Sequence, residues 1–127
     1  MIDRLHLSER GITGLEIDSR NLIVRVKIDS ISRLPVGSNE WSYYDEEDLD
    51  NGYLVFSDVF FLEVSPAGII PGDYIIEYEL VEKHTSWEFT IITVGQPNRV
   101  YKGDKESTIK IKFHDCWLEN KNKERVP

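Results

Sequence analysis

The stretch Leu15-Glu-Ile-Asp-Ser-Arg-Asn-Leu-Ile-Val-Arg-Val-Lys-Ile28 predicts a β-hairpin and, with it, the fold class. Before residues 18–21, Leu15 and Ile17 alternate with acidic residues, and after them apolar residues alternate with basic ones. A period of two places successive side chains on opposite faces of a strand. The polar segment 18–21 between the two runs is short enough for a tight turn. We therefore expect two antiparallel strands with one face toward a core.

The same period recurs along the rest of the chain. Aromatic and β-branched residues dominate 53–64, where the alternation slips near Ser57 and indicates a bulge or two short strands in succession. Segments 74–82 and 87–94 are typical of a second hairpin, and 107–119 of a closing strand. The sequence thus predicts a mainly β fold with little helix, an antiparallel β-sandwich or rolled sheet of about six to seven strands.

Length and composition are those of one domain. At 127 residues, with 40% hydrophobic and 11% aromatic residues, the chain can bury a core without disulfides, and it has a single cysteine. We expect a single domain over 1–127. Two polar segments stand out within it, an acidic loop at about 38–51 and a polar tail at about 120–127 that we expect to be frayed.

The charge balance restricts the choice of partner. The chain has 15 basic and 23 acidic residues, a net charge of −8. Such a surface repels nucleic acid and anionic membranes, whereas a basic protein would be attracted. The longest apolar runs, about four residues, are far short of a membrane span, and charges near Met1 do not fit a secretory signal. We expect a cytoplasmic protein with a protein partner.

The segment 40–51 is the most unusual part of the sequence, because it combines six acids with three aromatic residues and has no base. Aromatic rings supply buried area in a protein interface, and acids steer a basic partner toward it. The candidate partner-binding residues are Trp41, Tyr43, Tyr44, Asp45, Glu46, Glu47, Asp48 and Asp50. The alternative is a solvated loop whose aromatic residues cover one end of the core. An EF-hand calcium loop does not fit, since its pattern would place Leu49 at a ligand position.

His114 and Cys116 form the second candidate site. On one strand they would share a face with Cα atoms about 7 Å apart, and a histidine can activate a cysteine as a nucleophile. Asp115 would then point to the opposite face, and no nearby element suggests an oxyanion hole. We favour the alternative of a packed, inert Cys116.

Motifs for metal, nucleotide and covalent catalysis are absent from the sequence. It contains no CxxC, HxH or HExxH, no GxSxG, and neither a P-loop nor GxGxxG. We therefore predict no catalytic residues, no metal site and no cofactor, and a protein that is not an enzyme.

The ordered pattern as a whole resembles a known class of proteins. It comprises the hairpin at 15–28, the acidic insert, and the segments Tyr53-Leu-Val-Phe-Ser-Asp-Val-Phe-Phe-Leu62, Trp87-Glu-Phe-Thr-Ile91 and Ile109-Lys-Ile-Lys-Phe-His-Asp-Cys-Trp117. In size, charge and strand pattern this is similar to small acidic uncharacterised bacterial proteins, some of whose relatives are regarded as immunity proteins of polymorphic toxin systems. The resemblance covers most of the chain but includes no diagnostic motif. It implies a cytoplasmic protein that acts by binding, often by blocking a toxin.

These observations lead to three hypotheses. The first is a non-enzymatic binding protein of the immunity type that neutralises a partner through the acidic aromatic loop. The second is a small enzyme or ligand-binding domain with a cleft near His114 and Cys116. The third is an accessory domain of a larger assembly whose strand edges pair with another chain.

Overall fold

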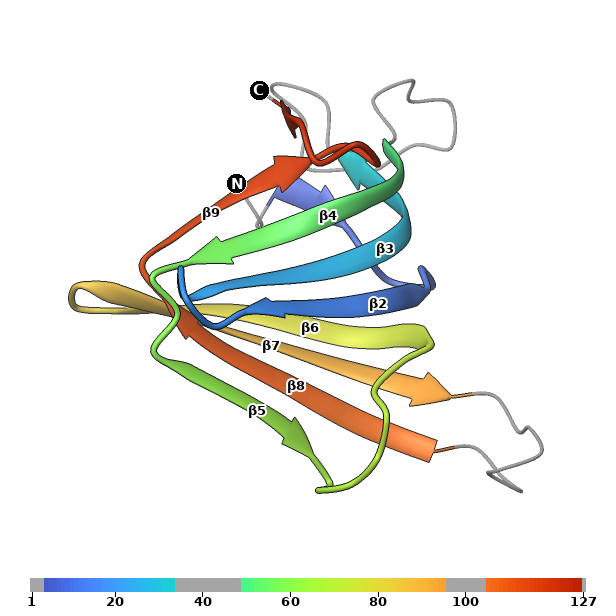
Figure 1. The fold of residues 1–127 in the computed structure, drawn as a ribbon. Coiled ribbons are helices and arrows are strands. Elements are labelled where there is room, and N and C mark those ends of the chain that lie inside the picture. The colour runs from blue at the N-terminus through green and yellow to red at the C-terminus, as the bar shows by residue number, and fades with distance from the viewer. Residues whose placement is uncertain (1–3, 34–48, 96–104, 127) are drawn as a thin grey trace.

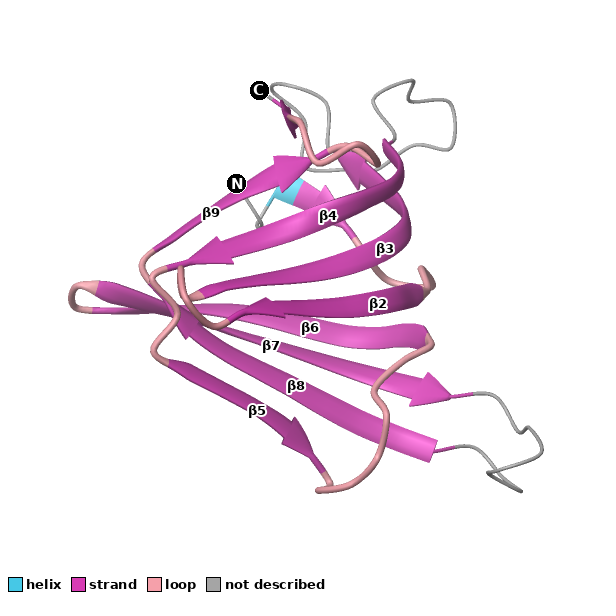
Figure 2. Cartoon of the chain, in the orientation of Figure 1, coloured by secondary structure: helices cyan, strands magenta, loops and turns pink. Residues whose placement is uncertain are grey.

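A computed structural model describes residues 4–33, 49–95 and 105–126 of the chain, which form two antiparallel sheets and no α-helix (Figures 1 and 2). The six-stranded sheet has the order β1-β3-β4-β9-β10, with β2 also paired to β3, and the four-stranded sheet has the order β5-β8-β7-β6. The strands are β1 (Leu5–His6), β2 (Ile12–Asp18), β3 (Ile23–Arg33), β4 (Leu49–Ser57), β5 (Phe61–Ser65), β6 (Tyr74–Lys83), β7 (Ser86–Gly95), β8 (Lys105–Phe113), β9 (Asp115–Glu119) and β10 (Arg125–Val126). The predicted mainly β, antiparallel fold is confirmed.

Both predicted hairpins are present. β2 pairs with β3 up to Asp18 and Ile23, and the Asp18 carboxylate accepts hydrogen bonds from the Asn21 backbone N–H (3.1 Å) and side-chain amide (2.9 Å). An aspartate that binds the backbone ahead of it favours a turn over continued extension. β6 and β7 form the second hairpin, with Lys83 opposite Ser86 across a two-residue turn.

The core lies between the inner faces of the two sheets. Its aromatic centre is Phe56 of β4, whose ring stacks on Phe89 of β7 at 5.5 Å and meets Phe113 of β8 edge-on at 4.8 Å. All three rings are fully buried. Because Phe56 belongs to one sheet and its two neighbours to the other, this contact joins the sheets directly.

One pair of segments crosses from sheet to sheet. β4 pairs with β9, and the strands that adjoin them along the chain, β5 and β8, pair in the second sheet. These segments therefore form a two-stranded ribbon that bends once, and we call it the bent ribbon. Backbone hydrogen bonds from His114 N to Ser57 O (3.2 Å) and from Phe60 N to Lys112 O (3.0 Å) lie at the bend.

The bend refines one prediction and corrects another. Segment 53–64 is two short strands in succession, one of the two explanations expected for the slip near Ser57. The prediction of a single closing strand over 107–119 is wrong, because the strand is interrupted at His114. A continuous strand could not serve both sheets, since the sheets diverge at this point (Figure 1).

The two sides of the sandwich differ. On one side, the segment before β2 bonds to β6: Glu9 N donates to Ile75 O (2.9 Å), Ile75 N to Arg10 O (2.8 Å) and Ile12 N to Asp73 O (2.6 Å). On the other side β5 is the outermost described strand of its sheet and pairs only with β8. The sandwich is thus closed along β6 and open along β5.

The polar tail forms a short hairpin that ends with β10 at Val126. β10 pairs with β9 through Arg125 and Glu119. The connecting turn is held by the Asn120 side-chain oxygen, which accepts hydrogen bonds from Asn122 N (2.9 Å) and Glu124 N (3.0 Å). Bonds of this kind from a side chain to the nearby backbone favour a defined turn in a polar segment.

Candidate binding surface

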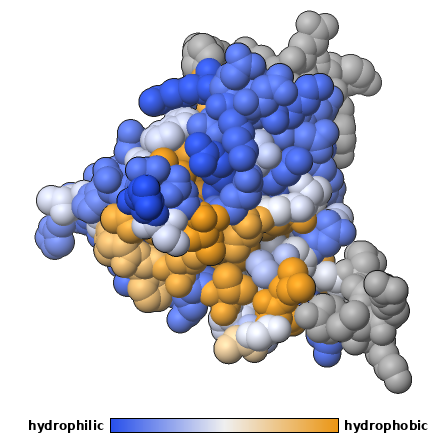
Figure 3. All heavy atoms as spheres, in the orientation of Figure 1, coloured by the Kyte–Doolittle hydropathy of each residue, from blue (hydrophilic) through white to orange (hydrophobic). Residues whose placement is uncertain are grey.

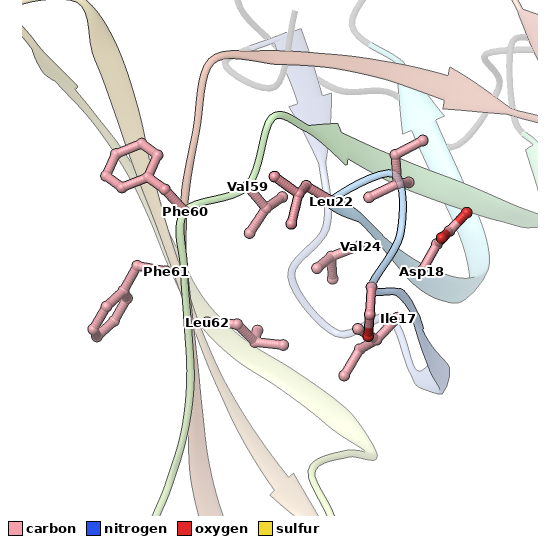
Figure 4. A pocket seen from close by; sticks show the side chains of 10 residues that line it. Ile17, Asp18, Leu22, Val24, Val59, Phe60, Phe61 and Leu62 are labelled. Atoms are coloured by element: carbon pink, nitrogen blue, oxygen red, sulfur yellow. The ribbon is translucent and has the colours of Figure 1, made fainter.

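A hollow of about 410 Å³ lies between the β2–β3 turn and the connection from β4 to β5. Figure 4 shows Leu22, Val59 and Leu62 pointing into it, whereas the rings of Phe60 and Phe61 lie on the other side of their strand. We call the hollow and its rim the mouth, defined by Ile17, Leu22, Val59, Phe60, Phe61 and Leu62. It is the opening of the sandwich on the side where β5 has no further partner among the described strands.

The mouth is an exposed apolar surface. Ile17, Leu22 and Phe60 are 59%, 54% and 55% exposed, whereas Val24 and Val59 beneath them are buried. Figure 3 shows an apolar band across this face, below a mostly polar upper surface. Single exposed apolar residues are ordinary on a protein surface. Several that adjoin one hollow are typical of an interaction site.

Local backbone geometry forms this surface. Leu22 and Asp58 have positive φ angles of 55° and 51°, a conformation that is costly for a residue with a β-carbon. The Val59 N–H donates to the Leu22 carbonyl at 3.0 Å and ties the two turns together. The same bond brings the exposed Leu22 side chain beside the apolar start of β5.

Three carboxylates lie at or beside the mouth. Asp18 lines the hollow, and Asp58 and Glu63 are exposed beside it. The side-chain and backbone hydrogen bonds from Asn21 lower the pKa of Asp18, so this carboxylate is ionised at neutral pH. None of the three forms a salt bridge with a described residue, whereas Lys112 lies over the Phe61 ring at 4.6 Å.

The predicted acidic binding loop lies mostly outside the described residues. This applies to Trp41, Tyr43, Tyr44, Asp45, Glu46, Glu47 and Asp48. Asp50 is described: it is exposed and pairs with Ser30 at the start of β4. The mouth lies beyond the other end of β4, about 24 Å along the strand from Asp50. The end of the acidic loop and the mouth are therefore separate regions of the molecule.

The structure gives His114 and Cys116 different surroundings. The His114 ring packs against Phe60 with centroids 5.3 Å apart, and its Nδ1 donates to the Thr85 carbonyl at 3.0 Å. Cys116 lies in β9, half-buried against the core, and its N–H donates to the Asp115 carboxylate at 2.8 Å. Because the strand is interrupted at His114, the expectation of a shared strand face is wrong. His114 instead packs on the Phe60 ring, on the side of the strand that faces away from the hollow.

A second polar cluster lies on the outer face of the six-stranded sheet. The Glu119 carboxylate is almost fully buried and accepts hydrogen bonds from Arg25 Nε at 2.8 Å and Trp117 Nε1 at 2.9 Å. Burial alone would raise the pKa of Glu119, but the hydrogen bonds from Arg25 and Trp117 outweigh it and lower the pKa. Arg125 of β10 lies over the Trp117 ring at 4.9 Å. With both carboxylate oxygens bonded, Glu119 is placed to hold the C-terminal hairpin rather than to transfer protons.

Residues 4–33, 49–95 and 105–126 contain no cluster of three or more His, Cys, Asp or Glu side chains suited to a metal ion. The same ranges contain no helix of the length and apolarity needed to cross a membrane.

Sequence comparison places the chain in a family without a described function. No curated protein and no solved structure gives a significant match. A family model described as a family of unknown function, DUF6258, matches residues 1–126. The chain therefore belongs to the DUF6258 family.

Proposed function

We propose that the chain is a non-enzymatic protein-binding domain that holds its partner at the mouth. The observation that carries this proposal is the convergence of Ile17 and Leu22, each more than half exposed, on one apolar hollow with a buried floor, beside the equally exposed ring of Phe60 across the strand. Full burial of a large apolar side chain is worth about 1.5–3 kcal/mol. A few such residues in a preformed hollow are the usual energetic centre of an interface.

Charge favours a basic protein as the partner. The net charge of −8 attracts a basic protein over a distance, and Asp18, Asp58 and Glu63 continue the negative field around the mouth. Binding of this kind would neutralise a partner in the way that immunity proteins do. The alternative of thiol chemistry gains no support from the site, since His114 directs Nδ1 to the Thr85 carbonyl and Cys116 packs on the core.

The double substitution Ile17→Ser and Leu22→Asn is expected to weaken partner binding at least tenfold without loss of stability. Both side chains are mostly exposed, so the folded state loses little burial, and asparagine tolerates the positive φ of Leu22 better than leucine. The measurement is calorimetric affinity for the stoichiometric basic protein captured from the native host. Ile76→Ser, a substitution of a 45%-exposed residue on β6, is the matched control. If the wild type, the double variant and Ile76→Ser bound the partner with equal affinity, the mouth would be excluded as the binding surface.

Neutralisation of the acidic loop should affect the association rate rather than the lifetime of the complex. The variant Asp45→Asn, Glu46→Gln, Glu47→Gln and Asp48→Asn removes four negative charges from the segment 40–51. We expect a several-fold lower association rate constant at low salt, a weaker salt dependence and an almost unchanged dissociation rate. Surface plasmon resonance at two salt concentrations measures both rates. The control neutralises Glu77, Glu79 and Glu82, and an equal effect per charge removed there would show that only net charge matters.

A further inference from the structure

The mouth is bordered by strand edges that have no partner in the described part of the chain. β2 pairs only with β3 along Gly14–Asp18, beyond the bond from Ile12 N to Asp73 O, and β5 pairs only with β8 along Phe61–Ser65. In an antiparallel ladder, alternate residues direct their N–H and C=O groups away from the paired strand. An exposed row of such groups beside an apolar hollow is the geometry that accepts an added strand from another protein.

Among the outer edges of β2, β5 and β6, the edge of β5 is the least protected against pairing with another strand. The β6 edge contains a register shift between Ile75 and Glu77 and is bonded to the segment before β2. The β2 edge contains a register shift between Ile12 and Gly14. β5 pairs with β8 in unbroken register, and Glu63 is its single charged residue. Bulges and charges are the usual means by which an edge strand avoids pairing, and β5 has the fewest of them.

The faces of β5 define the side chains that an added strand would need. Leu62 points into the hollow and Val64 packs against the core, so alternate residues of the added strand would face apolar surface. Glu63 points to the opposite, solvent-exposed face and forms no described salt bridge. A residue directly opposite Glu63 would therefore be favoured if it were basic. A second copy of this chain is disfavoured, because it would bring its own −8 charge to the same acidic rim.

We propose that the mouth takes an extended segment of its partner, which adds as a strand to the open edge of β5. The segment alternates apolar residues, which fill the hollow beside Leu22 and Leu62, with basic residues, one of which faces Glu63. This inference rests on the proposed function, and it specifies the conformation and the sequence pattern of the bound segment.

Random 12-residue peptides displayed on phage provide the test, with the full chain as the immobilised target. We expect the enriched peptides to alternate apolar and basic residues and to lack proline within that run. The best of them, made synthetically, should lose at least tenfold in affinity for the Ile17→Ser/Leu22→Asn variant. Panning against Glu63→Lys should replace the basic residue that faces position 63 with an acidic one.

Backbone methylation separates strand addition from other ways of filling the hollow. Methylating one peptide nitrogen at a time should abolish binding at alternate positions and spare the positions between them. The β5 amides that do not bond β8 should exchange with solvent at least tenfold more slowly in the complex. Binding that needs the mouth but tolerates every methylation would overturn strand addition and leave the proposed function intact. Enriched peptides that bind the wild type and the Ile17→Ser/Leu22→Asn variant equally would count against both strand addition and the proposed function. The absence of any enrichment would do the same.

Discussion

Phe56→Ala is expected to lower the free energy of unfolding by about 3–5 kcal/mol, the range for truncation of a buried phenylalanine. Phe56 has no exposed surface and contacts two further buried rings, Phe89 and Phe113, from the opposite sheet. Its removal leaves a cavity at the only place where three aromatic rings of the described core meet. Each lost aromatic pair adds about 0.5–1.5 kcal/mol to the cost of burial alone.

Urea denaturation followed by tryptophan fluorescence measures this loss. Phe61→Ala is the matched control, since the same truncation on the rim removes a ring that is 36% exposed, and we expect a much smaller effect. Natural domains have about 5–15 kcal/mol of stability in total, so Phe56→Ala could leave too little for a full transition. In that case Phe56→Leu replaces Phe56→Ala. We expect it to lose less stability than Phe56→Ala but still more than the control Phe61→Ala. Similar losses for Phe56→Ala and Phe61→Ala would contradict a core shared by the two sheets.

Glu119→Ala is expected to cost about 2–3 kcal/mol at neutral pH, the range for loss of a hydrogen-bonded charged partner. It leaves the Arg25 guanidinium and the Trp117 indole N–H without their acceptor. The pKa of Glu119 is lower in the folded chain than its ordinary value, so its ionised form stabilises the fold. This contribution is fully present above the unfolded-state pKa and is lost as pH falls through the lower, folded-state pKa. The penalty should therefore shrink at acid pH.

The free energies of unfolding of the wild type and of Glu119→Ala, measured from pH 7 to pH 3, test the direction of this pH dependence. The difference between wild type and Glu119→Ala should be constant from pH 7 to about pH 5 and should fall in more acidic solution. Glu16→Ala, which removes the carboxylate of the exposed pair with Lys123, is the control and should have a far smaller effect. A Glu119 penalty that grew toward acid pH would reverse the inferred direction of its pKa.

Local signals in the sequence were sufficient for the hairpins. The Asp18–Asn21 turn and the run at 22–28 identify β2 and β3 because both the turn bonds and the alternation are short-range. The interruption at His114 also has a sequence signal. The residues that pack on the core change from positions 109, 111 and 113 to 116 and 118, and this shift of phase marks the change of sheet. The polar residues between them concealed it, because they fit a continuous strand as well as a bend.

The candidate site could not be predicted in the same way. Ile17 and Leu22 fit the apolar alternation of a hairpin, and their exposure follows from where the other sheet ends. In the sequence Glu119 looks like any acid at the end of a strand, yet its partner Arg25 lies 94 positions away. Such features depend on tertiary contacts between distant segments, which composition and periodicity do not encode. The acidic loop remains a prediction, since all but Asp50 of its candidate residues lie outside the described ranges.

The bent ribbon has a consequence for the order in which the chain folds. Its strands are distant in sequence, as the pairing of Phe56 with Cys116 illustrates, and the whole β6–β7 hairpin lies between them. The two hairpins can form early because each needs only a short loop to close, whereas the ribbon must first close a long one. A fold completed by such distant pairings belongs among the slow folders, on the order of milliseconds to seconds. Until the ribbon closes, Phe56 stays apart from Phe89 and Phe113, so we expect the aromatic core to form late in folding.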